Sequence, residues 1–154
     1  DDASKTIKTI YNQTTFAPLA NLVEGWILLQ EKDYTGSLTI LQTSRNGFLG
    51  LSEFHEALAL GAQGIVYVFQ EDMKGVELII SELENFGESA GAKNMIGIIK
   101  LYMGDHSKGY KILQDNILND NPYIYFFIDP KLDQFRNDAQ FIKLLTLYNK
   151  DTIS

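Results

Sequence analysis

The sequence predicts an all-α protein of stacked antiparallel helix hairpins. A glycine stands eight residues before an aspartate three times, in the pairs Gly25 and Asp33, Gly64 and Asp72, and Gly97 and Asp105. The intervals between the glycines are 39 (64 minus 25) and 33 (97 minus 64) residues, and each aspartate precedes a segment with apolar residues at helical spacing. Periods near 34 residues are typical of solenoids, whose helix-turn-helix units bury their apolar faces by stacking on one another.

Composition places the chain among folded, acidic domains. Its 154 residues are 45% hydrophobic and 12% aromatic, which excludes a disordered chain and suits one domain. The formal net charge of −7 repels a polyanion, so we expect no direct binding of nucleic acid. The absence of cysteine excludes disulfides and thiolate zinc sites.

The apolar segments are too short for a membrane helix. The most apolar run, residues 57–69, is shorter than the roughly 20 residues that a helix needs to span a bilayer. We therefore expect no membrane association. No basic leader with an apolar core is visible at the start. We expect a cytoplasmic protein, although the absence of cysteine leaves the compartment open. The start at Asp1 without methionine leads us to expect a piece of a longer protein.

A leading helix and a first hairpin are expected before the second hairpin. Ile7, Ile10 and Tyr11 predict a leading helix within residues 1–15. The first hairpin is expected over residues 18–46, with Pro18 in the first turn of its first helix and Asn46 before Gly47 ending its second helix.

The second hairpin, residues 53–86, follows a longer loop. Residues 48–52 supply the extra length of the first interval, and Ser52 is placed to cap the helix after it. The second helix of this hairpin has the most regular apolar stripe in the chain, formed by Val76, Ile79, Ile80 and Leu83.

The third hairpin, residues 91–118, is followed by a helical tail over residues 121–148. Asn121 before Pro122 and Asp129 before Pro130 each predict a capped helix start. Residues 123–128 are predicted as one or two helical turns, and residues 138–148 as a final helix that caps the stack.

The repeated positions resemble the tetratricopeptide repeat family over residues 18–118. The small residue of the first helix matches Gly25, Gly64 and Gly97, and the turn aspartate matches Asp33, Asp72 and Asp105. The large apolar residue of the second helix matches Leu41, Ile80 and Leu113. The early tryptophan position departs from the family, with Asn21, Leu60 and Lys93, and so does the second-helix alanine, replaced by Ser37, Val76 and Gly109. The resemblance implies a right-handed superhelix that binds proteins.

The tail resembles a narrower group within that family. Residues 122–141 are similar to the closing segment of repeat domains attached to bacterial transcription regulators, adenylate cyclases and kinases. This similarity implies a sensory or interaction module of a bacterial signalling protein whose effector domain lies outside this chain.

The repeated glycines have a reason in packing. Glycine within a helix costs about 0.5 to 1 kcal/mol relative to alanine, so close approach of the partner helix has to offset that cost. We expect a side chain at Gly64 to push Val76 or Ile80 outward.

The pattern of titratable residues predicts neither an enzyme nor a metal or cofactor site. His55 lacks a second histidine four residues on, where Ala59 stands, and His106 occupies a turn position that is usually aromatic in the family. Gly47 with Gly50 and Gly61 with Gly64 lack the lysine of a phosphate loop. An enzyme on a helical scaffold remains the alternative, as does a self-associating structural protein.

The concave face of the first helices is the predicted binding groove. It is lined by Leu22, Trp26, Gln30, Ile65, Phe69, Asn94, Ile98 and Tyr102. A mostly apolar lining disfavours a ligand held by its terminal carboxylate and leaves two occupants, a partner peptide or the chain's own tail at residues 123–127. The partner is thus expected to be a protein, a peptide, the tail or the missing effector domain, and the oligomeric state stays open.

Overall fold

A computed structural model describes residues 16–119 and 130–151, and all of its regular structure there is helical. The α-helices are α2 (Ala17–Gln30), α3 (Tyr34–Phe48), α4 (Glu53–Phe69), α5 (Met73–Glu84), α6 (Ala90–Tyr102), α7 (His106–Leu118) and α8 (Ala139–Asp151). A 3₁₀ helix, η2, spans Pro130–Phe135. The expected leading helix and the expected turns at residues 123–128 lie outside the described residues.

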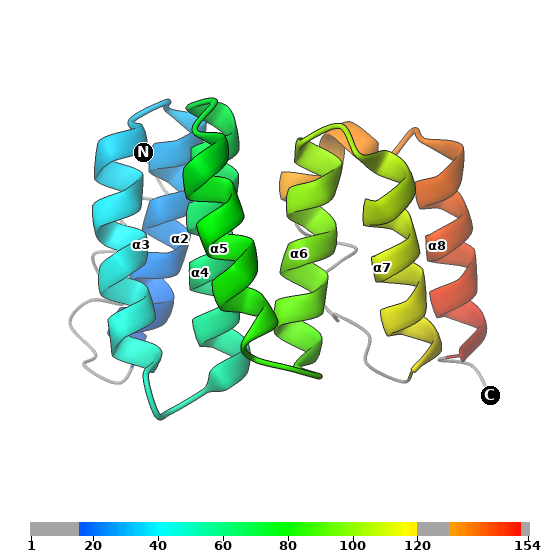
Figure 1. Cartoon of the computed structure of the whole chain (residues 1–154), viewed down its shortest axis with the longest axis horizontal. Coiled ribbons are helices and arrows are strands. Elements are labelled where there is room, and N and C mark those ends of the chain that lie inside the picture. Colours follow the sequence, from blue (N-terminus) through cyan, green and yellow to red (C-terminus); the bar gives the residue numbers. More distant parts are fainter. Residues whose placement is uncertain (1–15, 120–129, 152–154) are drawn as a thin grey trace.

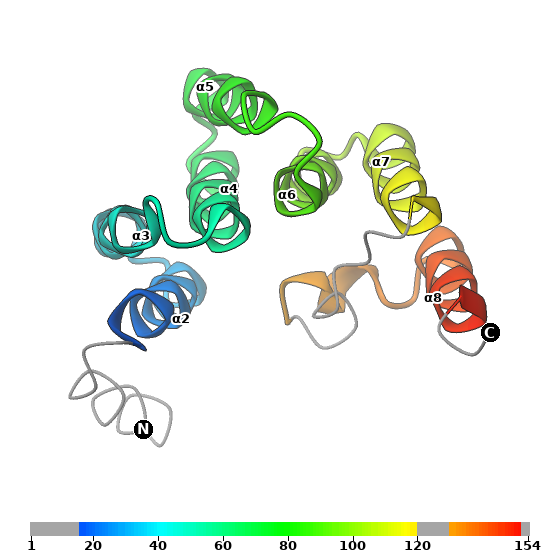
Figure 2. The same ribbon diagram turned by 90° about the horizontal axis from the view of Figure 1, so that it is seen from below.

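The helices pair as antiparallel hairpins and follow an arc. α2 packs on α3, α4 on α5 and α6 on α7, while α4 also contacts α3 and α6 and so joins neighbouring hairpins (Figure 1). Seen along the helices, α2, α4 and α6 line the inner side of the arc, and η2 lies inside it next to α6 (Figure 2). α8 packs against α7 at the far end.

The turn inside each hairpin has the same construction three times. The residue before each aspartate is left-handed, with φ of 64° at Lys32, 58° at Glu71 and 83° at Gly104. The N–H of Asp33 donates to the oxygen of Leu28, and the same bond recurs from Asp72 to Tyr67 and from Asp105 to Lys100. These are Schellman motifs, in which a left-handed residue satisfies the last carbonyls of a helix.

Each aspartate also caps the next helix. Its carboxylate accepts a hydrogen bond from the backbone N–H of the residue three positions later, at 2.9 Å for Asp33 and 3.1 Å for Asp72. The equivalent distance at Asp105 is 3.4 Å, where the Lys108 ammonium also lies 3.0 Å away. The hydrogen bond from Lys108, ahead of its charge, lowers the pKa of the Asp105 carboxyl. The aspartates expected at the turns therefore also serve as the N-caps of the helices that follow.

The repeated glycines mark the closest helix contacts. A Cβ on Gly25 would lie 2.5 Å from Leu41, and one on Gly97 would lie 2.9 Å from Leu113. At Gly64 the nearest atoms belong to Ile99 at 2.7 Å and Ile79 at 2.9 Å. The expectation that Val76 or Ile80 would meet a side chain there was wrong, because α4 is held between α5 and α6.

Polar side chains hold the second helix of a hairpin to the first. The Ser37 hydroxyl donates to the Gly25 carbonyl at 2.7 Å. Ser44 donates to the Pro18 carbonyl at 2.7 Å, and Asn116 donates to the Ala90 carbonyl at 3.0 Å. Ser44 and Asn116 occupy equivalent positions of α3 and α7, so the repeat extends to this contact.

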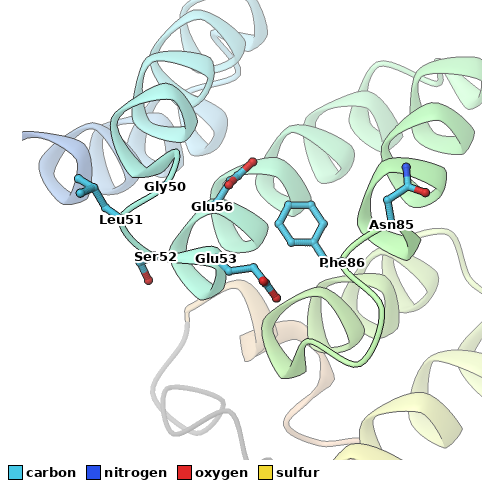
Figure 3. Close-up of a pocket in the computed structure, with 7 residues that line it drawn as sticks. All are labelled: Gly50, Leu51, Ser52, Glu53, Glu56, Asn85 and Phe86. Carbon is cyan, nitrogen blue, oxygen red and sulfur yellow. The ribbon is translucent and has the colours of Figure 1, made fainter.

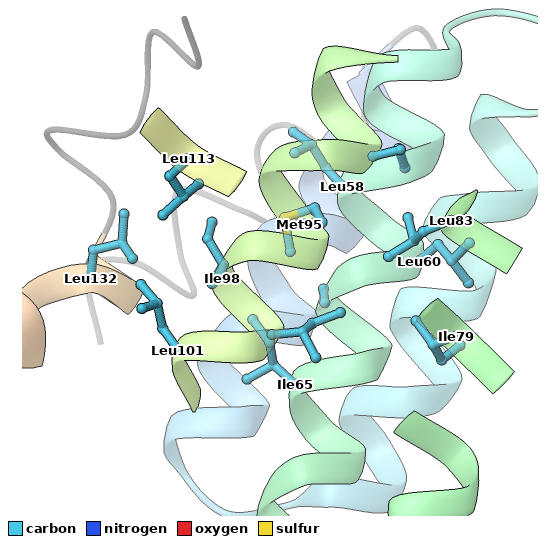
Figure 4. Packing of buried hydrophobic residues seen from close by; sticks show 14 of the residues in the cluster. Leu58, Leu60, Ile65, Ile79, Leu83, Met95, Ile98, Leu101, Leu113 and Leu132 are labelled. Carbon is cyan, nitrogen blue, oxygen red and sulfur yellow. The ribbon is translucent and has the colours of Figure 1, made fainter. Parts of the chain in front are cut away.

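The core is continuous from the first hairpin to the tail. Leu60, Ile65, Met95 and Ile98 are fully buried between the hairpins (Figure 4). Leu132 of η2 is also fully buried and belongs to the same cluster, on the side of Leu101 and Leu113 (Figure 4). The tail segment 130–135 therefore seals the inner side of the third hairpin.

Helix limits differ from the expected ones at two places. α3 continues through Gly47 to Phe48, because Gly47 serves close approach to Pro18, whose Cγ would lie 2.5 Å from an added Cβ. α8 begins after the Asp138 cap as expected but extends to Asp151.

In the described ranges, no helix combines the length and apolarity needed to cross a membrane.

Candidate functional site

The predicted groove residues differ in their accessibility. Leu22, Ile65, Asn94 and Ile98 are buried in the helix stack, and Trp26 and Tyr102 are half-buried. Gln30 and Phe69 are exposed. Gln30, Phe69 and Tyr102 are the last residues of α2, α4 and α6, so the accessible part of the predicted groove is concentrated where the inner helices end.

A row of aromatic rings connects these helix ends. The ring of Phe69 lies 6.4 Å from that of Tyr34 and 5.6 Å from that of Tyr102. Tyr102 in turn contacts Phe135 of η2 at 5.6 Å, in an edge-to-face arrangement. His106 continues the row, 5.8 Å from Phe135 and 6.2 Å from Tyr110. We call these six residues the aromatic row.

A cavity of about 570 Å³ opens beside the middle of the aromatic row. Phe69, Tyr102, Phe135 and His106 supply its ring walls, and its charged side chains are Glu71 and Asp138. It lies where the second hairpin, the third hairpin and the tail meet. Its volume is within the range of pockets that hold small ligands or side chains of a partner.

Three titratable groups gather at the tail side of this cavity. The His106 Nδ1 is 3.9 Å from the Asp138 carboxylate, which caps α8 by accepting from the Gln140 N–H at 2.8 Å. Burial, ahead of the nearby charge of Asp138, raises the pKa of Tyr110. The Tyr110 hydroxyl is buried near the Asp138 carboxylate and makes no hydrogen bond of normal geometry within the described structure.

A second hollow lies at the opposite ends of the helices. It has a volume of about 490 Å³ and is formed by the loop after α3, the start of α4 and the end of α5, with Glu53, Glu56 and Phe86 around it (Figure 3). Arg45 bridges Glu56 at 3.6 Å and Glu82 at 2.8 Å. This ion pair ties the first hairpin to the second, so we assign Glu56 a structural role.

Sequence reasoning identified part of the aromatic row. Phe69 and Tyr102 were predicted from the register of the first helices. Tyr34, Phe135 and Tyr110 were not predicted as part of a site, because they come from the start of α3, from the tail and from α7. The family position after the turn aspartate, usually aromatic, pointed to Tyr34 and His106 and was the signal that could have found them.

Among the described residues, no group of three or more histidines, aspartates and glutamates is arranged to hold a metal ion. Comparison with protein-family models, curated proteins and solved structures gave no match for this chain.

Proposed function

We propose that this chain is a tetratricopeptide-like scaffold that binds a peptide segment of a partner protein along the aromatic row. Three hairpins with Schellman turns and aspartate caps, and with close helix contacts at Gly25, Gly64 and Gly97, support the likeness to that family. The similarity of residues 122–141 to the tails of bacterial signalling repeat domains supports a sensory or regulatory setting, with binding rather than bond chemistry as the activity.

The observation that carries the proposal is the aromatic row with its cavity. Aromatic side chains dominate the energetics of protein interfaces, because they bury a large area with few rotatable bonds. Phe69 is 48% exposed even though it contacts Tyr34 and Tyr102, so an apolar ring is held ready at the surface. A short peptide crossing the helix ends would cover it.

The chain's own tail occupies part of the inner side, which limits where a partner binds. Leu132 and Phe135 are buried against the third hairpin. The proposed peptide site is therefore the stretch from Tyr34 over Phe69 to the cavity at Tyr102, next to the tail and not beneath it.

Selection from a displayed library of random peptides tests this proposal. We expect selected peptides to bind the wild-type chain and to lose most of their affinity for Phe69→Ser. The matched control is Leu78→Ser, which removes an apolar side chain of 60% exposure from α5. Peptides that bind Phe69→Ser as well as the wild type, or a selection without enrichment, would contradict the proposal.

A further inference from the structure

The cavity beside the aromatic row combines ring walls with negative charge. Among the residues that the structure describes, the carboxylates that line it are Glu71 and Asp138. Neither lysine nor arginine is among the lining residues. The described lining therefore carries an excess of negative charge whatever the charge of His106.

The neighbouring cations are engaged elsewhere. The Lys108 ammonium lies 3.0 Å from Asp105, and the Arg136 guanidinium pairs with Asp133 at 2.5 Å. Glu71 forms no ion pair within the described residues, and the charged-group contact of Asp138 there is with His106 at 3.9 Å. Among the described side chains, neither cavity carboxylate therefore forms an ion pair with a lysine or an arginine.

The ring walls favour the same kind of ligand as the carboxylates. The faces of aromatic rings carry partial negative charge and attract cations, an interaction of about 0.5 to 1 kcal/mol at exposed sites and more when water is excluded. Phe69, Tyr102 and Phe135 meet edge to face, so each ring is turned at a steep angle to its neighbour. Such rings form the corner of a box, not a flat platform.

We infer that this cavity binds the guanidinium group of an arginine in the partner peptide, a specificity that rests on the peptide-binding function proposed above. Guanidinium is planar, stacks on rings and pairs with carboxylates through two parallel hydrogen bonds, whereas ammonium is a compact and strongly hydrated charge. The cavity of about 570 Å³ has room for the group together with its aliphatic stem. The arginine recognises the cavity, and the rest of the peptide lies along the aromatic row.

Titration with capped amino acids, followed by NMR, tests the inference without a selected peptide. The probes are N-acetyl-arginine N-methylamide, its uncharged citrulline analogue and tetramethylammonium, at pH 8, where imidazole is generally neutral. We expect the arginine probe to shift the ring signals of Phe69, Tyr102 and His106 saturably. The citrulline probe should bind about five-fold more weakly, in line with the size of a cation–π contribution.

Charge-neutralising variants locate the effect. Glu71→Gln combined with Asp138→Asn should weaken arginine binding and bring it closer to that of citrulline, while the ring walls stay intact and asparagine preserves the cap of α8. The control Glu77→Gln with Asp115→Asn removes two exposed charges from α5 and α7 and should leave arginine binding unchanged.

Several results would overturn the guanidinium assignment. The first three are equal binding of citrulline and arginine, the absence of a saturable shift, and an unchanged arginine affinity in the neutralised variant. The fourth is tighter binding of tetramethylammonium than of the arginine probe, which would indicate a small quaternary ammonium ligand. Selected peptides that depend on Phe69 but lack arginine would refute this specificity and leave the peptide-binding proposal standing. Conversely, saturable arginine binding combined with a selection that enriches no peptide would contradict the peptide-binding proposal and leave the guanidinium site standing.

Discussion

At the scale of single residues, the turn aspartates hold two helices at once. The N–H of Asp72 closes the Schellman motif of α4, and its carboxylate caps α5. The residue before it is forced into the left-handed region, where a side chain is disfavoured by roughly 1 to 2 kcal/mol. In the third hairpin Gly104 adopts the left-handed conformation without strain, whereas Lys32 and Glu71 adopt it with backbone strain.

Exchanging residues at these positions should change stability in opposite directions. We expect Lys32→Gly to raise the free energy of unfolding by about 0.5 to 1 kcal/mol through relief of the left-handed strain. Gly104→Ala should lower it by about 1 kcal/mol, since an added Cβ there meets nothing within 4 Å and only the backbone is strained. Urea denaturation measures both, and a stabilising Gly104→Ala would contradict the assigned turn.

Tyr110 gives a prediction about alkaline pH. Because burial raises its pKa in the folded state, the folded chain keeps the phenol proton where the unfolded chain has lost it. Stability should therefore fall as pH rises above about 10, the ordinary tyrosine value, and Tyr110→Phe should show a smaller fall.

At neutral pH we expect Tyr110→Phe to be neutral or slightly stabilising, because it removes a buried hydroxyl that lacks a partner. Denaturant titrations at pH 7 and pH 11 compare the two proteins. A variant that loses as much stability as the wild type between these pH values would refute the role of Tyr110.

Helical periodicity located the site residues by face but could not give their accessibility. Leu22, Ile65 and Ile98 lie on the predicted side of the first helices, yet they are buried because the inner helices pack on one another and on the tail. Asn94 is 3% exposed for the same reason. Burial of this kind depends on contacts between distant segments, which spacing within one helix does not contain.

At the scale of elements, α4 is the most constrained helix. It contacts α3, α5 and α6, and its small residues permit this. Gly64 faces Ile79 of α5 and Ile99 of α6, and Gly61 faces Met95 of α6. A helix held between two neighbours has no free direction in which to move when a side chain is added.

We expect Gly64→Leu to lower stability by about 1 to 3 kcal/mol, the usual cost of overpacking, because neither Ile79 nor Ile99 has room to withdraw. For a chain of this size that corresponds to a fall of roughly 3 to 10 °C in melting temperature. Glu77→Leu on the exposed side of α5 is the control for added hydrophobicity. An unchanged melting curve of Gly64→Leu would show that the proposed register is wrong.

The hairpins could be predicted from the sequence almost to their ends, because each contains its own start and stop signals. Ser52 caps α4 as expected, and Asp72 and Asp105, which were expected only as turn residues, also cap the helices that follow them. Gly47 misled because a glycine that ends a helix and a glycine that admits a neighbour look alike in sequence. The position of η2 next to α6 could not be predicted from the sequence, because it depends on the tertiary contacts of Leu132 and Phe135.

At the scale of the whole molecule, the arc brings three separate segments to one surface. α4 contributes Phe69, α6 contributes Tyr102 and the tail contributes Phe135, so the central part of the aromatic row exists only when hairpins and tail are assembled. The acidic cavity lies at the same junction. This explains why no short motif in the sequence announces the site.

The most direct test of the peptide-binding surface is photo-crosslinking to a selected peptide. p-Benzoylphenylalanine replaces Phe69 in one protein and Leu78 in another, and both positions are exposed. If the peptide crosses the helix ends beside the aromatic row, position 69 crosslinks to it strongly and position 78 does not. Crosslinking from position 78, with none from position 69, would contradict the account.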